Sequence, residues 1–361
     1  RRHARSARRA VSLDALDAAA RLARARGRAV LRADGWTFVT AEPSAALLAR
    51  GRSLVRLDAR GRPARRFTGD PLAAIADFLA EHACTTGALA GDPAPRVIGY
   101  LAYDLARVVG ELHLPGGAAP AGDVADVWLA AYPAVARWAP GAREPELVGE
   151  PAWRDALARP APPALAPSLA GFVHDDDASH HMARRARADD HLAAGELDRL
   201  FLARRMVAPI AAPGEPLAVY RALAPLPWHA LLDTGASHVI AGGTQRLPAG
   251  DLRAHFPAES VTGAPRPRAM QLIDELERVR RGAFAGAFGH FGPTGGALAV
   301  TTRAGVITRD ELRVYTGAMI EAPDTGREQP DDPEAAELAA WAAALAALGA
   351  GRARPPRRPA R

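Results

Sequence analysis

The sequence predicts an α+β fold, and three observations support this prediction. Helical and strand-like segments occur in separate blocks, whereas a doubly wound parallel sheet requires them to alternate. The length of 361 residues is typical of two domains of roughly 150 residues or of one large domain. Hydrophobic residues make up 48% of the chain and charged residues 24%, so the chain can bury a sizeable core.

The amino-acid composition argues against several classes of protein. Cys84 is the single cysteine, so an intrachain disulfide is excluded and a reducing compartment, the cytoplasm, is expected. No apolar run is long enough to span a bilayer, and no membrane partner is expected. The formal net charge is +6 and every basic residue apart from histidine is arginine. Aromatic residues are only 6% of the chain, and a basic stripe with interleaved aromatics is not found, so nucleic acid is not expected as a partner.

Composition also divides the chain into regions. Residues 1–11 form a basic N-terminus and residues 349–361 a basic, proline-rich tail, and both are expected to be disordered. Residues 159–168, RPAPPALAPS, form the best linker. It separates an N-terminal lobe, 12–158, from a C-terminal region, 169–348.

The N-terminal lobe opens with a predicted hairpin. Residues 28–43 form two short strands around an Asp-Gly turn, a dipeptide that favours tight hairpins. Residues 70–83 have the spacing of an amphipathic helix, with the leading aspartate as its cap. Further strands are expected in 95–115, which continues into a helix or turn, and in 123–138.

The C-terminal region begins with a long predicted helix. Residues 177–206 contain a helix that ends near Gly195 and continues into a strand. Beyond a later helix, three strands form a meander over 282–292, 295–308 and 311–322, with PTGG and TRDE as turns.

That later helix follows the turn in SVTGAPRPRAMQLIDELERVRRG, residues 260–282. Ser260 or Thr262 can cap it through a hydroxyl oxygen, and Pro265 suits the first helical position, where its missing N–H would be unpaired anyway. Apolar residues recur at helical spacing and predict one buried face, namely Ala269, Leu272, Ile273, Leu276 and Val279. The segment is consistent with an ordinary capped helix. It is also consistent with an anion site, because Gly263 lets a ligand approach the backbone at a helix N-terminus.

Several segments, in order, resemble the chorismate-utilising enzymes, closest to component I of aminodeoxychorismate synthase (para-aminobenzoate synthase) and related to anthranilate synthase component I. IGYLAYDLARVVGELHLP, residues 98–115, resembles the family's Gly-Tyr…Tyr-Asp-Leu…Arg…Glu…Leu-Pro block. FPAESVTGAPRPRAMQLIDELERVRRGAFAGAFGHFG, residues 256–292, is the longest similar stretch. Shorter similarities are AGELDRLFLARRM at 194–206, AVTTRAG at 299–305 and DPEAAEL at 332–338. The resemblance implies two large antiparallel sheets with outer helices.

By this resemblance, residues of the Gly-Ala-Pro turn and of the following strands bind chorismate, a small dicarboxylate. They are Thr262, Gly263, Ala264, His290, Arg303 and Gly317. Arg303 is implied to bind the enolpyruvyl carboxylate, since a guanidinium matches a carboxylate with two hydrogen bonds. On the residues alone, a surface ion pair is the commoner role for such an arginine.

The resemblance also implies Mg²⁺, held by carboxylates that include the last acidic helix. Glu334 and Glu337 lie three residues apart on one helical face. One alignment places them at a Glu-x-x-Glu pair of the family whose second member binds the metal, and both are candidate ligands here. A second alignment, starting from Asp332-Pro333, places Ala336 and Ala339 there instead. A solvated helix face is the alternative role for the two glutamates.

A block of the family pattern is absent between HVIAGGTQRL, residues 238–247, and FPAESVTGAP, residues 256–265. An internal deletion is therefore expected near 247–256, and the fold is expected to be incomplete. In the family this block carries another metal ligand and the general acid, so no catalytic residue is assigned.

The resemblance implies formation of 4-amino-4-deoxychorismate from chorismate and ammonia, a step towards para-aminobenzoate and folate. A glutamine amidotransferase subunit is the implied source of ammonia. Tyr-Asp-Leu at 103–105 favours this branch. The alternatives are an anthranilate synthase component I-like protein and a non-catalytic, degenerate relic of the family. Because of the absent block, the chain is expected to be impaired as an enzyme.

Overall fold

The structure is a computed structural model that describes residues 13–83, 94–110, 124–163, 165–174, 178–223, 226–248, 252–293, 295–321 and 333–350. The side chains of residues 178, 333–336 and 349–350 lie outside this description. The predicted basic N-terminus, Cys84 and the tail beyond residue 350 also lie outside the described residues.

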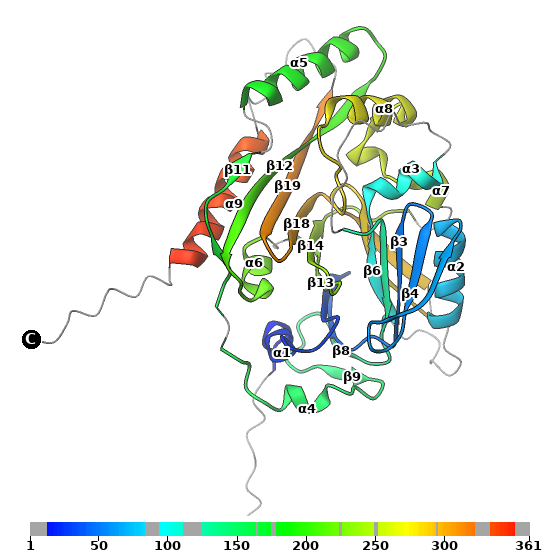
Figure 1. The fold of residues 1–361 in the computed structure, drawn as a ribbon, viewed down its shortest axis with the longest axis vertical. Helices are drawn as coiled ribbons and strands as arrows, with labels where there is room; N and C mark the ends of the chain where they lie inside the picture. The colour runs from blue at the N-terminus through cyan, green and yellow to red at the C-terminus, as the bar shows by residue number, and fades with distance from the viewer. Residues whose placement is uncertain are drawn as a thin grey trace, which may run out of the picture.

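The larger of two sheets spans the molecule (Figure 1). Its strands in spatial order are β10 (Ser168–Leu169), β12 (Arg199–Ala212), β19 (Glu311–Glu321), β18 (Arg303–Ile307), β14 (His238–Gly243), β13 (Trp228–Asp233), β1 (Ala29–Ala33), β2 (Trp36–Thr40), β8 (Val135–Trp138) and β9 (Glu146–Val148). Two short strands, β11 (Val173–His174) and β15 (Gly263–Ala264), also pair with β12.

The smaller sheet contains seven strands of the described chain. They are β17 (Gly295–Val300), β16 (Ala287–Gly292), β6 (Val97–Leu101), β7 (Val127–Ala131), β3 (Ala45–Arg50), β4 (Ser53–Leu57) and β5 (Pro63–Thr68). Every strand pairing among the described residues, in both sheets, is antiparallel. The predicted pair of antiparallel sheets is confirmed.

Each sheet contains strands from both sides of residues 159–168. In the larger sheet β1 pairs with β13, and in the smaller sheet β6 pairs with β16. The two regions that the proline-rich segment separates in sequence are therefore joined by shared hydrogen-bonded sheets. Non-local pairing of this kind leaves no local sequence signal, because the paired strands lie far apart along the chain.

Helices flank the sheets (Figure 1). They are α1 (Ala15–Arg21), α2 (Pro71–His82), α3 (Ala106–Val109), α4 (Arg154–Leu157), α5 (Ala178–Ala193), α6 (Pro216–Leu223), α7 (Leu252–His255), α8 (Arg266–Leu276) and α9 (Pro333–Ala350). Short 3₁₀ turns cover Tyr103–Leu105 and Glu259–Val261. None of the described helices has the length and apolar character needed to cross a bilayer.

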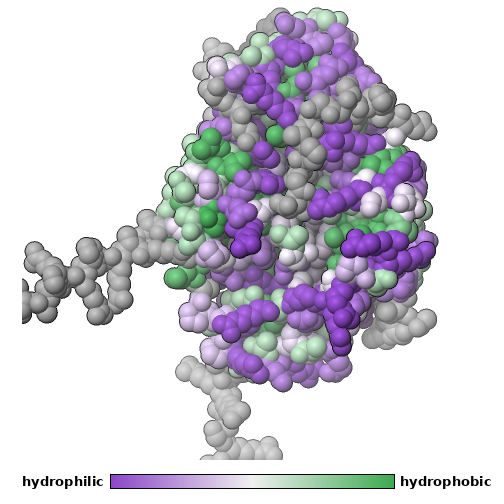
Figure 2. Space-filling model, viewed as in Figure 1, coloured by the Kyte–Doolittle hydropathy of each residue, from purple (hydrophilic) through white to green (hydrophobic). Residues whose placement is uncertain are grey.

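Two apolar cores lie on opposite faces of the larger sheet. In β1, Leu31 faces the core between the two sheets, whereas Val30 faces the core under α1, α6 and α9. Successive strand residues point to opposite faces, so a strand that is covered on both sides has a continuous apolar sequence. Figure 2 shows hydrophilic residues over most of the displayed face, with a group of hydrophobic residues beside α9.

Local sequence signals placed several elements correctly. The Asp-Gly turn joins β1 to β2 with positive φ at both Asp34 (50°) and Gly35 (81°), as a tight hairpin turn requires. Asp70 caps α2 by accepting a hydrogen bond from the Leu72 amide at 3.0 Å. The predicted helix before Gly195 is α5, and the strand after it is β12.

Candidate functional site

Arg303 begins β18 and lies beside β19, below α9. Its Nη2 atom lies 2.5 Å from Oε1 of Glu337. Its guanidinium also covers the ring of Trp341, with 5.4 Å between the guanidinium carbon and the ring centroid. The side chain remains 31% exposed. The surface ion-pair role, which the residues alone favoured, is thus the contact that Arg303 makes in this structure.

Helix α9 positions Glu337 through its apolar face. Leu338, Trp341 and Leu345 are buried in the core on the outer face of the larger sheet, and their helical spacing fixes which side of α9 faces the strands. Glu337 lies one turn before Trp341, so its carboxylate reaches the start of β18. Its second oxygen, Oε2, accepts a hydrogen bond from the hydroxyl of Thr316 on β19.

Both carboxylate oxygens of Glu337 are therefore engaged within the protein. Magnesium takes near-octahedral oxygen ligands, and a guanidinium in contact with Oε1 opposes a second cation there. Among the described residues, no group of three or more histidine, cysteine, aspartate or glutamate side chains is placed to hold a metal ion. The side chain of Glu334, the other predicted ligand, lies outside the described part of the chain. A metal ion at Glu337 would have to displace Arg303 or Thr316 from its carboxylate.

The Thr-Gly-Ala turn packs against the first residues of β12. Gly263 pairs with Leu200, and Ala264 pairs with Arg199. The Thr262 amide donates to the carbonyl of Glu259 at 3.1 Å, and its own carbonyl accepts from the Phe201 amide at 2.9 Å. These backbone groups are occupied by the fold.

The predicted helix cap is wrong in detail. Pro265 is itself the N-cap of α8, and no side chain hydrogen-bonds to the cap. The Thr262 hydroxyl instead donates to the Ala258 carbonyl at 3.0 Å, because the 3₁₀ turn before it presents that acceptor. The buried face of α8 is confirmed for Ala269, Leu272, Ile273 and Leu276, whereas Val279 lies beyond its end.

Two glycines of the predicted site are required by close backbone packing. Gly263 has a φ of 138°, and a Cβ atom there would lie 2.3 Å from the Arg199 carbonyl oxygen. A Cβ atom on Gly317 would lie 2.5 Å from both the Leu202 carbonyl oxygen and the Phe201 ring. In both cases the close neighbour is β12.

His290 lies outside the larger sheet. It is on β16 in the smaller sheet and lines a cavity of about 260 Å³ together with Asp34 and Arg246. Burial lowers the pKa of His290 to about 4, with Arg246 lowering it further and Asp34 opposing this. Its Nδ1 atom is buried without a hydrogen-bond partner among the described residues. Of the six predicted substrate residues, His290 is the only one that lines this cavity.

A buried ionic network connects the Tyr-Asp-Leu motif to the end of α8. Arg281 and Glu277 have side chains only 1% and 6% exposed, with Arg281 Nη2 2.6 Å from Glu277 Oε1. The Arg281 guanidinium also lies over the Tyr103 ring at 4.7 Å. Asp104 accepts a hydrogen bond from the Gly282 amide at 3.0 Å. Sequence reasoning used this motif only to choose between family branches and missed that it anchors the segment after α8.

The buried carboxyl of Asp104 predicts a measurable pH effect. Burial raises the pKa of Asp104 to about 6, against the Gly282 amide and Arg107, which lower it. Because the folded state holds this proton more tightly than the unfolded state, the protonated carboxyl stabilises the fold at a pH below about 4, the unfolded-state pKa. This stability is lost as the pH rises through about 6, the folded-state pKa. Asp104→Asn should remove this dependence. Between pH 4 and pH 7, the free energy of unfolding of the variant should therefore rise relative to that of the wild type by roughly 2–3 kcal/mol. Urea unfolding of both proteins at each pH tests this, and parallel pH profiles would contradict it.

Comparison with known proteins places these residues in a family context. Residues 248–322 match the family of chorismate binding enzymes. Anthranilate synthase component 1 from Pseudomonas aeruginosa is 41% identical over 91 residues, which are 24% of this chain and 18% of that protein. Aminodeoxychorismate synthase from Streptomyces griseus is 42% identical over 74 residues, which are 20% of this chain and 10% of that protein. The chain thus matches less than a fifth of the length of these curated relatives.

Solved structures share the fold over most of the chain. Anthranilate synthase component I from Streptococcus pneumoniae aligns with a TM-score of 0.66 at 17% identity, covering 86% of this chain and 92% of that one. The menaquinone-specific isochorismate synthase from Escherichia coli aligns with a TM-score of 0.62 at 16% identity, covering 94% and 92%. The predicted resemblance is confirmed by sequence over residues 248–322, and the two-sheet fold is confirmed by structure.

Proposed function

We propose that this chain binds chorismate through Arg303, because residues 248–322 match the family of chorismate binding enzymes. The observation that carries the proposal is the position of this arginine. It lies inside the matched region, at the start of a central strand, with 31% of its side chain exposed. A partly exposed guanidinium on a rigid strand can receive a carboxylate with two hydrogen bonds.

The reaction we propose for this lineage is formation of 4-amino-4-deoxychorismate in the cytoplasm, with ammonia from a glutamine amidotransferase subunit. The Tyr-Asp-Leu motif supports this branch. A second candidate is anthranilate formation, which the printed name of the Pseudomonas aeruginosa relative supports. Chromatographic identification of any product formed from chorismate and ammonium distinguishes the two. Binding of Mg²⁺ by Glu334 and Glu337 stays a prediction.

For chorismate to bind at Arg303, its carboxylate must replace that of Glu337 at the guanidinium. Glu337 already contacts the guanidinium, so a chorismate carboxylate competes with the carboxylate of α9 for the same donors. The two anions also repel each other at this distance. Chorismate affinity is therefore expected to be limited by the Arg303–Glu337 ion pair.

Titration calorimetry with chorismate tests the role of Arg303. Arg303→Ala is expected to weaken chorismate binding by about 1.5–3 kcal/mol, the scale of a charge-assisted hydrogen bond. The control is Arg309→Ala, which removes the same charge from an exposed position in the turn that follows β18. Equal affinities for the wild type and Arg303→Ala would show that Arg303 does not bind the substrate.

The same titration with Glu337→Gln separates the two roles of this glutamate. If Glu337 competes for Arg303, the neutral amide should bind chorismate more tightly than the wild type. If Glu337 is instead a magnesium ligand for the substrate, Glu337→Gln should bind more weakly, and only when Mg²⁺ is present.

A further inference from the structure

A large cavity lies in the N-terminal part of the chain, outside the region that matches the chorismate binding enzymes. Its volume is about 900 Å³, near the upper end of the range for small-molecule sites. The cavity is bounded by the end of α1, the connection between β2 and β3, α4 and residues 159–163. Its lining residues all precede residue 164, so none belongs to the matched region 248–322. The segment predicted as a linker is thus one wall of this cavity, which we call the proline cavity.

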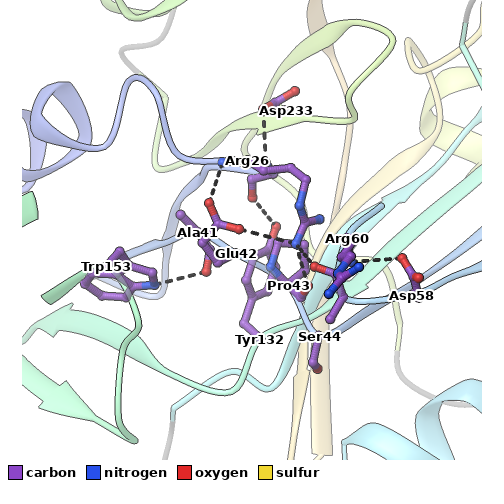
Figure 3. Close-up of polar contacts among 12 residues, drawn as sticks. Arg26, Ala41, Glu42, Pro43, Ser44, Asp58, Arg60, Tyr132, Trp153 and Asp233 are labelled. Carbon is purple, nitrogen blue, oxygen red and sulfur yellow. Dashed lines mark hydrogen bonds and ion pairs between the residues drawn. The ribbon is translucent and has the colours of Figure 1, made fainter. Parts of the chain in front are cut away.

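The walls of the proline cavity are largely apolar and stiff. Prolines from three separate chain segments line it, namely Pro43, Pro133, Pro160, Pro162 and Pro163, and the ring of each holds φ near −65°. Trp153 contributes an aromatic wall that is 5% exposed, and its indole N–H donates to the Ala41 carbonyl at 3.0 Å (Figure 3). An apolar ligand body would be received by a surface that is already formed, which lowers the entropy cost of binding.

The acidic residue of the proline cavity is already neutralised. Glu42 has a φ of 54°, a backbone conformation that is uncommon outside glycine. Its Oε1 accepts from the Arg26 amide at 2.9 Å, and its Oε2 lies 3.4 Å from the Arg26 guanidinium (Figure 3). The same guanidinium donates to the carbonyls of Pro43 and Ala59 at 2.9 and 2.7 Å. Glu42 and Arg26 therefore form a closed, neutral unit.

Three arginines line the proline cavity, and two of them carry uncompensated charge. Arg21 pairs with Asp17 at 2.7 Å. Arg24, after α1, and Arg159, at the start of the proline-rich segment, are exposed and have no ion-pair partner among the described residues. They come from two separate chain segments, Arg24 from the residues after α1 and Arg159 from the proline-rich segment. The surplus charge is thus positive and sits beside apolar walls.

From this combination we infer that the proline cavity binds a small organic anion with a flat apolar body, an aryl carboxylate. Guanidinium groups pair with the carboxylate, while proline rings and the Trp153 indole receive the aromatic ring. Inorganic phosphate could pair with the guanidinium groups, but it would leave the apolar walls exposed to water. An uncharged aromatic covers the walls but leaves the charge without a partner.

The test uses 2-naphthoate as the probe, with uncharged 2-naphthol as its matched neutral analogue. Equilibrium dialysis measures the dissociation constants for the wild type and for each variant. We expect 2-naphthoate to bind at least tenfold more tightly than 2-naphthol, and more weakly as salt screens the charges. The double variant Arg24→Gln/Arg159→Gln should weaken 2-naphthoate binding at least tenfold. The control variant is Arg52→Gln/Arg66→Gln, which removes the same charge from two exposed positions, one directly before β4 and one on β5. It should change the dissociation constant of 2-naphthoate less than twofold.

A second readout locates the probe. Naphthoate bound in the proline cavity should quench tryptophan emission, and Trp153→Phe should remove most of that quenching. Equal weakening by the two double variants would show unspecific attraction to an arginine-rich surface and overturn the inference. Loss of binding in Arg303→Gln would place the probe at the proposed chorismate site instead. Displacement of 2-naphthoate by equimolar phosphate, or no binding of the probe at millimolar concentration, would also overturn it.

Discussion

The purified chain, supplied with saturating chorismate, Mg²⁺ and ammonium, is expected to turn over at least about 10²-fold more slowly than 1 s⁻¹, an ordinary enzyme rate. Two observations support this expectation. The family block that resemblance assigns to the general acid is absent near 247–256, and such an acid contributes about 10²–10⁴-fold. In addition, Arg303 and Glu337 are engaged with each other, so a substrate must displace one of them before it is positioned.

The assay follows the product by its fluorescence, with each fraction checked chromatographically. Anthranilate synthase component 1 from Pseudomonas aeruginosa, assayed in the same mixture, serves as the positive control. A rate near 1 s⁻¹ for this chain would refute the prediction and would require catalytic groups elsewhere. The first candidate would then be His290, whose imidazole is neutral at neutral pH because burial lowers its pKa to about 4.

Glu277→Ala should lower the free energy of unfolding by about 3–5 kcal/mol, since it leaves Arg281 as an unpaired buried charge. Glu277 accepts two hydrogen bonds from Arg281, at 2.9 and 2.6 Å, and one from the Ala203 amide at 2.9 Å. The loss therefore affects both the end of α8 and the part of β12 between its pairings with β15 and β11. Urea denaturation monitored by circular dichroism measures it.

Two further variants make that experiment interpretable. Glu150→Ala removes an exposed partner of Arg154, and its denaturation midpoint should stay at the wild-type value because exposed ion pairs contribute little. Glu277→Ala/Arg281→Met removes the buried charge as well as its partner and should recover part of the lost stability. If Glu277→Ala unfolded at the same urea concentration as the wild type, the pair would not stabilise the fold.

Short-range signals explain which elements could be predicted. The cap of α2, the Asp-Gly hairpin and the apolar face of α8 depend on residues within a few positions of one another, so the chain sequence contains the whole interaction. The N-cap of α8 was missed for a related reason. Thr262 had a competing acceptor, the Ala258 carbonyl, which becomes available only when the preceding residues form a 3₁₀ turn.

The candidate site was predicted as one group of residues, and the tertiary structure shows which neighbours each of them contacts. Arg303 and Glu337 meet each other, the Thr-Gly-Ala turn packs on β12, and His290 lies in a cavity of the smaller sheet. The family resemblance placed these residues in one binding site because their order along the chain matches the family pattern. Which of them come into contact depends on strand pairing and helix packing across long separations.

The sequence by itself determined the α+β class, the capped and amphipathic elements and the relationship of residues 248–322 to the chorismate binding enzymes. These follow from local spacing, turn chemistry and a continuous similar stretch. The tertiary structure alone decided that strands from both halves share each sheet, that Glu337 contacts Arg303, and that residues 159–163 line a cavity. The physical reason is that each of these contacts joins segments far apart along the chain. Their free energy arises only when the sheets have paired and α9 has packed, and no local pattern encodes it.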